Sequence, residues 1–185
     1  MIEEVEWTEV ETPAGRGWVD TMHLTETVDR TSFERDPRPR RLLDGFIEAL
    51  RRGSDVGGVV SQHGLWVSHH DAPVYFAPDE AAGLMASTVR RRWRGRNPAY
   101  PDAEGRFAET VAPGILRAWD HPRRTVGVDA PSVPSTVVPV EFTNLHMMSI
   151  GADLSGRERL DQNAWMVFFT YEGGRPRILA LVKEG

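Results

Sequence analysis

The chain has 185 residues, of which 40% are hydrophobic and 26% are charged, and its formal net charge is −5. This composition is typical of a soluble globular protein, and the length allows one domain with a small appendage. It leaves no stretch for a membrane span, and an acidic chain lacks the basic face on which nucleic-acid binding depends. Cysteine is absent, which excludes disulfides, thiol nucleophiles and thiolate metal ligands.

The chain opens with Met1-Ile2-Glu3-Glu4, which has neither the basic nor the apolar region of a signal peptide. By itself this start predicts a cytoplasmic protein. Prior removal of an upstream signal would instead make the protein secreted or attached to the cell surface, so the compartment stays open.

Residues 1–26 are expected to form a small β segment. Strands fall at Val5–Val10, Gly17–Val19 and Met22–Leu24, with a turn at Pro13-Ala14-Gly15. So short a segment cannot bury its own core, which predicts that it docks on the rest of the chain through Trp7 and Trp18 or by strand pairing. The polar residues 27–37 are expected to be a linker.

From residue 38 onward helices and strands alternate. Apolar residues from Leu42 to Leu50 recur at spacings of three and four, which predicts an amphipathic helix that ends at Gly53. Ser54 is expected to cap a short helix that runs to Val60. The elements expected next are strands Gly64–His70 and Val74–Phe76, helix Asp79–Ser87, loop Asn97–Gly105, helix Phe107–Trp119 kinked or divided at Pro113-Gly114, linker Ala130–Pro139, and strands Val137–Phe142 and Asn144–Ile150.

The C-terminal region predicts a β-hairpin with strands Asn163–Tyr171 and Arg177–Lys183. They are joined at Gly173-Gly174, because two glycines tolerate the positive φ angles of a type I′ turn. The expected pairs are Trp165–Val182, Val167–Ala180 and Phe169–Ile178 on one face, and Met166–Leu181 and Phe168–Leu179 on the other. Both faces are apolar, so helices should cover one face, and a cavity, a second chain or another segment should cover the other.

The order helix, helix, strand, short helix and a run of antiparallel strands resembles the NTF2-like family. The resemblance covers residues 38–185 and implies an α+β domain in which a curved antiparallel sheet packs on helices and forms a cone. It is carried by Leu42–Arg52, by Val59-Val60-Ser61 before Gly64-Leu65-Trp66-Val67, by Val74-Tyr75-Phe76 before Asp79-Glu80-Ala81, and by Trp165–Val182.

The N-terminal β segment resembles a different family. Trp7-Thr8-Glu9-Val10, Thr12-Pro13-Ala14-Gly15-Arg16-Gly17-Trp18-Val19 and Leu24 are similar to the second half of a bacterial SH3-like (SH3b) domain. That resemblance implies attachment to cell-wall peptide. The combination with an α+β domain resembles uncharacterised secreted or surface proteins of bacteria.

His146 is the residue on which chemistry could rest. The NTF2-like resemblance places its strand beside the terminal hairpin, so that Asn144, His146, Trp165 and Tyr171 form the candidate pocket. An imidazole opposed by a donor in such a cone would suit proton transfer, although no spacing places a carboxylate beside His146. In His69-His70-Asp71 neighbouring strand residues face opposite sides, so we expect no metal site and no cofactor.

The leading hypothesis is a non-catalytic binding or interaction module at the bacterial cell surface or envelope. Its ligand would be an unknown small molecule or a cell-wall component. Two alternatives stay open: a small-molecule enzyme of the NTF2-like fold that uses His146, and a dimerisation or accessory domain in which a second copy covers the doubly apolar hairpin. Neither nucleic acid nor a membrane span is expected.

Overall fold

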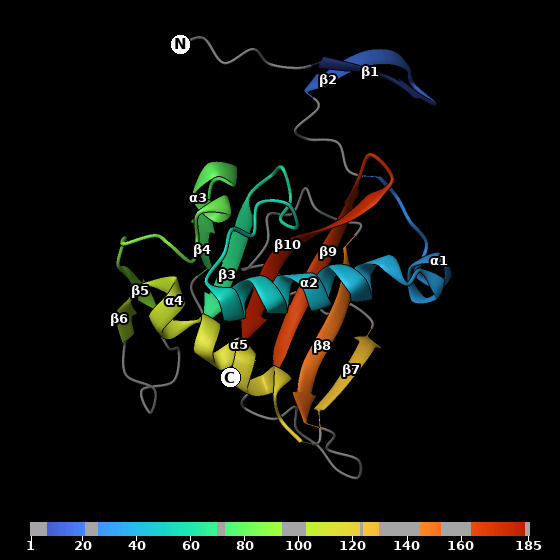
Figure 1. Cartoon of the computed structure of the whole chain (residues 1–185). Coiled ribbons are helices and arrows are strands. Elements are labelled where there is room, and N and C mark those ends of the chain that lie inside the picture. The colour runs from blue at the N-terminus through green and yellow to red at the C-terminus, as the bar shows by residue number, and fades with distance from the viewer. Residues whose placement is uncertain are drawn as a thin grey trace.

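The structure is a computed structural model that describes residues 7–20, 26–69, 73–93, 103–122, 124–129, 145–152 and 164–183. These residues form an α+β fold, as expected, in which a curved six-stranded sheet carries helices across one face (Figure 1). In spatial order the strands are β4 (Pro73–Phe76), β3 (Leu65–His69), β10 (Arg175–Lys183), β9 (Trp165–Glu172), β8 (His146–Ala152) and β7 (Arg124–Asp129). The expected strands Met22–Leu24 and Val137–Phe142 and the linker Ala130–Pro139 lie outside the described residues.

One pairing in this sheet is parallel. β3 runs parallel to β10, with Trp66 beside Ala180, whereas the other neighbouring strands are antiparallel. The expectation of a wholly antiparallel sheet is therefore wrong at this pair. A pattern of apolar residues sets the face that a strand buries, but it does not set the strand's direction when the partner is far away in the chain.

The β9–β10 hairpin contains a β-bulge at Leu179. Near the turn the register is as expected, with Phe169 opposite Ile178. Beyond the bulge the pairs are Ala180–Phe168, Leu181–Val167, Val182–Met166 and Lys183–Trp165. The expected pairs Trp165–Val182, Val167–Ala180, Met166–Leu181 and Phe168–Leu179 are therefore wrong by one residue. An extra residue in one strand leaves no trace in the sequence pattern when both faces of that strand are apolar.

The two faces of β9 are buried in separate apolar clusters, which confirms the expected division. Trp165, Val167 and Phe169 belong to the main core, whereas Met166 and Phe168 belong to a second cluster on the opposite face. None of these five side chains is more than 5% exposed. The second cluster also contains Leu145, Met147, Leu179, Ala180 and Val182.

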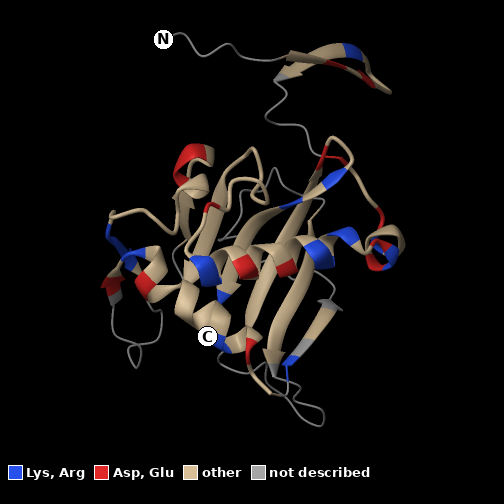
Figure 2. Ribbon diagram, in the orientation of Figure 1, with Lys and Arg blue, Asp and Glu red and all other residues tan. Residues whose placement is uncertain are grey.

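Helix α2 (Arg38–Arg52) crosses the first face of the sheet (Figure 1). It buries Leu43, Phe46, Ile47 and Leu50 at the expected helical spacing and ends at Gly53, whose φ of 64° is left-handed. Basic and acidic residues are interspersed on its outer side (Figure 2), where they form ion pairs one turn apart.

Helices α4 (Phe107–Thr110) and α5 (Ala112–Trp119) occupy the stretch where one helix, kinked or divided, was expected. They divide at Val111, close to Pro113-Gly114, where a kink or division was expected. α5 packs beside α2 and contributes Ile115 and Trp119 to the main core. None of the described helices has the length and the apolar content needed to span a membrane.

The expected linker 27–37 is partly helical. Helix α1 (Arg30–Arg35) begins after Asp29, whose side chain accepts a hydrogen bond from the Ser32 amide. Phe33 is only 2% exposed and lies in the main core. Two apolar residues, Val28 and Phe33, in a polar stretch were too weak a signal to predict this packing.

At the N-terminal end, β1 (Trp7–Thr12) and β2 (Gly15–Asp20) pair as an antiparallel hairpin, which forms a two-stranded sheet. The two short strands expected there are confirmed. Trp7 and Trp18 are 57% and 64% exposed, and no described residue of the hairpin is buried. The expectation that these two rings dock on the rest of the chain is therefore wrong.

Between α2 and β3 the chain does not form the expected short helix. Val59 O accepts a hydrogen bond from Ile178 N, and Ser61 N donates to Ile178 O, each at 2.9 Å. The loop therefore runs along the first half of β10. The remaining described elements are α3 (Pro78–Ala82), which is shorter than expected, and the paired strands β5 (Arg91–Trp93) and β6 (Ala103–Gly105).

Candidate functional site

His146 is held by the backbone. It lies opposite Phe169, is 8% exposed, and its Nε2 atom is 2.8 Å from the carbonyl oxygen of Val28. A carbonyl only accepts, so Nε2 carries the proton of this bond. The ring stacks on Phe33 with centroids 4.4 Å apart, and burial lowers the pKa of His146, so the imidazole is neutral at neutral pH. This geometry ties the segment before α1 to β8.

Tyr171 meets His146 edge to face, with ring centroids 6.2 Å apart. Its hydroxyl donates to Oδ2 of Asp36 at 2.8 Å, and Asp36 also accepts from Nε of Arg38 at 2.9 Å. The Arg38 guanidinium lowers the pKa of Asp36 to about 2, whereas burial and the Asp36 carboxylate raise the pKa of Tyr171. The phenol is therefore a fixed donor in a network that joins β9 to the start of α2.

Trp165, a third residue of the expected pocket, does not join this pair. Trp165 lies opposite Ile150, which is about 13 Å along β8 from His146 at the usual rise of a strand. Its indole ring is fully buried and borders Gly114 of α5. Asn144 lies outside the described residues. The structure thus brings His146 and Tyr171 together and separates Trp165 from them.

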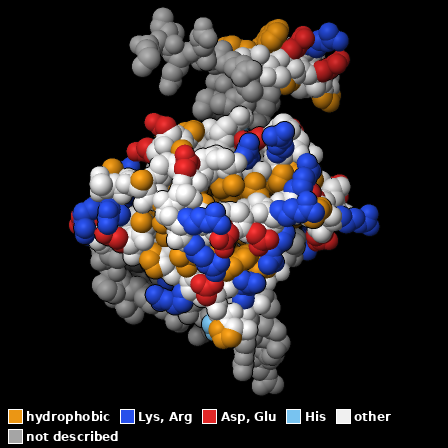
Figure 3. All heavy atoms as spheres, in the orientation of Figure 1, with side chains coloured by type: hydrophobic (Ala, Val, Ile, Leu, Met, Phe, Trp, Pro, Cys, Tyr) orange, Lys and Arg blue, Asp and Glu red, His pale blue; other side chains and the backbone are white. Residues whose placement is uncertain are grey.

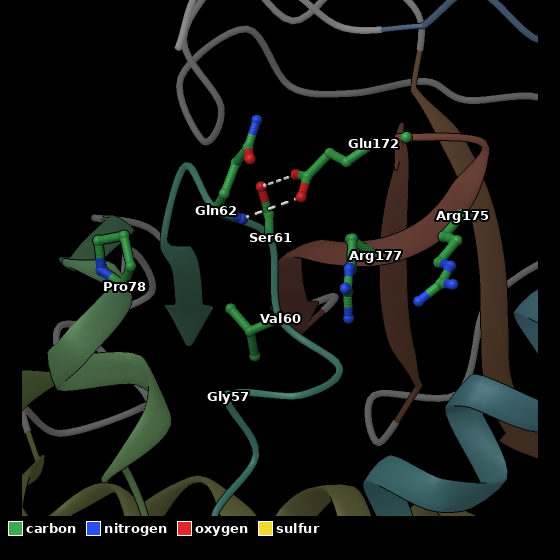
Figure 4. A pocket seen from close by; sticks show the side chains of 9 residues that line it. Gly57, Val60, Ser61, Gln62, Pro78, Glu172, Arg175 and Arg177 are labelled. Carbon is green, nitrogen blue, oxygen red and sulfur yellow. Dashed lines mark hydrogen bonds between the residues drawn. The ribbon is translucent and has the colours of Figure 1, made fainter. Parts of the chain in front are cut away.

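A cleft of about 620 Å³ lies beside the β9–β10 turn (Figure 4). Three segments form its walls: the loop 57–62, the first residue of α3, and the turn with the beginning of β10. We call it the turn cleft, and it is lined by Gly57, Val60, Ser61, Gln62, Pro78, Glu172, Gly173, Arg175 and Arg177.

Local sequence explains how the cationic wall forms. Gly173 and Gly174 have φ angles of 55° and 70°, which suit a type I′ turn and place β10 directly after it. Arg175 and Arg177 alternate with the buried Pro176, so both lie on the same side of β10. Figure 4 shows the two guanidinium groups extending in the same general direction.

Two guanidinium groups and one carboxylate line the turn cleft. Glu172 lies directly opposite Arg175, yet its carboxylate accepts hydrogen bonds from Ser61 Oγ and from Gln62 N. Arg177 donates through Nη1 to the carbonyl oxygen of Gly58. The Arg175 side chain makes no ion pair or hydrogen bond with any residue that the structure describes.

This arrangement is suited to holding an anion. Guanidinium groups offer several N–H donors in a planar fork that matches the oxygens of a carboxylate or phosphate. The described lining residues include no histidine, lysine or tyrosine, and the Glu172 carboxylate is already engaged by Ser61 and Gln62.

A second cleft, of about 430 Å³, lies outside Tyr171 and is lined by Glu26, Val28, Ser32, Arg35, Asp36, Arg38, Tyr171 and Gly174. Its two arginines are matched by two acids. Asp36 engages Arg38, and an oxygen of Glu26 accepts from Gly174 N at 2.7 Å. An incoming anion would compete there with two carboxylates, which favours the turn cleft.

The sequence analysis did not identify the turn cleft. The available signal was Arg175-Pro176-Arg177 directly after two glycines, because alternation along a strand puts both arginines on one side. The facing wall at Ser61 comes from a distant part of the chain, and no local pattern could place it there.

No protein-family model, curated protein or solved structure matches this chain. The function must therefore be argued from the geometry of the site itself.

Proposed function

We propose that the chain is a non-catalytic binding module that holds a small anionic molecule in the turn cleft. The observation that carries the proposal is Arg175, whose guanidinium lines the cleft without a described partner although Glu172 is its cross-strand neighbour. Two cations on one wall repel each other, and a bound anion would remove this repulsion. The ligand class is a carboxylate or a phosphate.

The surface around the cleft favours a small ligand over an extended polyanion. On the face shown in Figure 3, acidic side chains lie among the basic ones over α2 and near the turn. A polyanion needs a continuous basic surface, because its affinity comes from many phosphate contacts at once. A small molecule needs only the cleft.

The two alternative functions have weaker support. An enzyme that uses His146 needs an imidazole that its substrate can reach, whereas this ring is buried, stacks on Phe33 and is held through Nε2 by Val28 O. A dimer was suggested by the second apolar face of the hairpin. Phe168 on that face is already fully buried within a single chain, so it does not require a second copy.

An NTF2-like fold for residues 38–185 is part of the proposal. It is supported by the order of α2, β3, β4 and α3 before β7–β10, and by α2 packed across the sheet. A cell-envelope location rests on the resemblance of residues 1–26 to the second half of an SH3-like domain. The binding proposal does not depend on that location.

The test is an NMR titration of the ¹⁵N-labelled chain with acetate and with inorganic phosphate. We expect millimolar affinity and shifts of the amide signals of Gln62, Gly173 and Arg175. Arg175→Gln should weaken binding about tenfold, because one charge-assisted hydrogen bond is lost. Arg117→Gln, an exposed arginine of α5, is the matched control and should leave the affinity unchanged.

Glycerol, which is small and neutral, should cause no shift at these amides. Absence of any shift with both anions would overturn the proposal. So would equal anion affinity of the Arg175→Gln variant and the wild type, since the site would then lie elsewhere.

A further inference from the structure

The turn cleft already holds a carboxylate of the chain itself. Oε1 of Glu172 accepts a hydrogen bond from the Ser61 hydroxyl, and Oε2 accepts one from the Gln62 amide at 3.1 Å (Figure 4). A hydroxyl and a main-chain N–H are donors that proteins commonly direct at bound anions. The loop at Ser61 is therefore a formed anion subsite in which Glu172 is the occupant.

This subsite is fixed in place before any ligand arrives. Ser61 is 2% exposed, and its amide donates to Ile178 O at 2.9 Å. Its Oγ accepts from His63 N at 3.0 Å, so the hydroxyl proton is free to be donated into the cleft. The turn closes with Gly64 N donating to Ser61 O at 3.0 Å. Preorganised donors lose little entropy when they bind an anion.

The position of Glu172 is informative because a cationic partner is close. Directly opposed side chains in an antiparallel pair have Cβ atoms about 5 Å apart, within reach of an ion pair. Glu172 and Arg175 are opposed in this way and form no salt bridge. The carboxylate occupies the Ser61–Gln62 subsite instead, and the Arg175 cation remains available to a ligand.

We infer that Glu172 is an internal substitute for one anionic group of the ligand, and that the ligand is a small dianion. One group would bind Arg175 and Arg177, and the other would displace the Glu172 carboxylate from Ser61 and Gln62. The inference rests on the proposed function, because it assigns a second subsite to the same cleft. Two carboxylates and two phosphates share the chemistry that this pair of subsites recognises.

Two substitutions separate the charge of Glu172 from its occupancy of the subsite. Glu172→Gln keeps the shape and removes the negative charge, so it should raise the affinity for any anion about fivefold by ending the repulsion. Glu172→Ala also empties the subsite. It should raise the affinity for a suitable dianion by roughly another tenfold, because the Ser61 and Gln62 donors become available.

The same NMR titration measures the affinity for each probe. Acetate is compared with malonate, succinate and glutarate, and inorganic phosphate is compared with pyrophosphate. The dianion whose affinity rises most in Glu172→Ala indicates whether the ligand is a dicarboxylate or a diphosphate. In the Glu172→Ala background, Ser61→Ala should abolish the extra gain for the dianion, whereas Arg117→Gln in the same background should preserve it. Melting temperatures of all variants establish that each one is folded.

A gain in Glu172→Ala that exceeds the gain in Glu172→Gln for a dianion, but not for acetate, supports the inference. Equal gains for acetate and for every dianion would overturn it, because Glu172 would then act only by repulsion. No gain in either variant, with wild-type binding intact, would also overturn the inference and leave the proposed function standing. Failure of all probes to bind every folded variant would overturn both.

Discussion

The phenol of Tyr171 in β9 donates a 2.8 Å hydrogen bond to Oδ2 of Asp36, one of the two residues between α1 and α2. The same carboxylate accepts a hydrogen bond from the main-chain nitrogen of Arg38 at 2.9 Å. This amide lies in the first turn of α2, where amides have no carbonyl partner inside the helix. One side chain therefore caps the helix and fastens it to the sheet. The consequence is a dependence of stability on the charge of Asp36.

Asp36→Asn should lower the free energy of unfolding by about 1–2 kcal/mol at neutral pH. The pKa of Asp36 is lowered from 3.8 to about 2, chiefly by Arg38. A depressed pKa means that this stabilisation is present above about pH 4 and is lost as the pH falls towards 2. Urea unfolding across this range should show the variant and the wild type converging at low pH.

The matched control is Asp44→Asn, because Asp44 pairs with Arg40 on the exposed side of α2. Exposed pairs contribute little, so this change should alter stability by less than about 0.5 kcal/mol. Equal losses in the two variants would show that Asp36 has no special role.

His146 should produce a second, separate pH dependence. Burial lowers its pKa below 6.5, so the unfolded chain binds a proton more readily than the folded chain. Stability is then complete above about pH 7 and declines as the pH falls below 6.5. His146→Phe should flatten the curve between about pH 6.5 and 5 and cost about 1 kcal/mol at neutral pH, because Val28 O loses its donor. Thermal melting at several pH values measures both effects.

The exposed His121 provides the comparison for this experiment. His121→Asn should retain the decline below about pH 6.5. If the decline disappears in this variant and persists in His146→Phe, the titrating group is not His146.

The sequence predicted the elements whose signal is local. The α2 stripe from Leu43 to Leu50, its end at Gly53 and the glycine turn of the last hairpin each follow from neighbouring residues. The bulge at Leu179 and the strand β7 could not be predicted from neighbouring residues, because neither changes the apolar pattern in a recognisable way.

The candidate site was less predictable than the fold. His146 and Tyr171 lie close together, since their strands are neighbours in the sheet. Their partners Val28 and Asp36 could not be foreseen, because both come from a polar segment with a single buried apolar residue. Contacts between distant segments decide which side-chain nitrogen or oxygen remains available to a ligand. These contacts cannot be read from the local pattern of a single sequence.

Phe168→Asp tests the second apolar face. Phe168 is fully buried between Met147 and Ala180, its cross-strand neighbours, so an aspartate there would be a buried and unpaired charge. We expect a loss of several kcal/mol in urea unfolding, with light scattering used to follow the oligomeric state. Val89→Asp, at a side chain that is 51% exposed, should change little. Unchanged stability and mass in Phe168→Asp would mean that this face is solvated.

Gly64→Ala should unfold or distort the loop that carries the anion subsite. Gly64 has a φ of 85°, and a Cβ there would lie 2.4 Å from the carbonyl oxygen of Phe76, which is backbone and cannot move aside cheaply. The expected cost is about 2–3 kcal/mol in urea unfolding, from the strained φ and the clash together. Gly58→Ala is the matched control, since a Cβ at Gly58 meets nothing within 4 Å.

The same pair of variants tests whether the loop and the cleft are coupled. Ser61 and Gly64 are joined by a main-chain hydrogen bond, so a shift at Gly64 should move the Ser61 hydroxyl away from Glu172. The amide signals of Ser61 and Gln62 should change in Gly64→Ala and stay nearly constant in Gly58→Ala. A Gly64→Ala variant with wild-type stability and unchanged amide signals would show that β3 and β4 can separate at Phe76 without disturbing the Ser61 loop. That result would contradict the inference that the anion subsite is fixed in place.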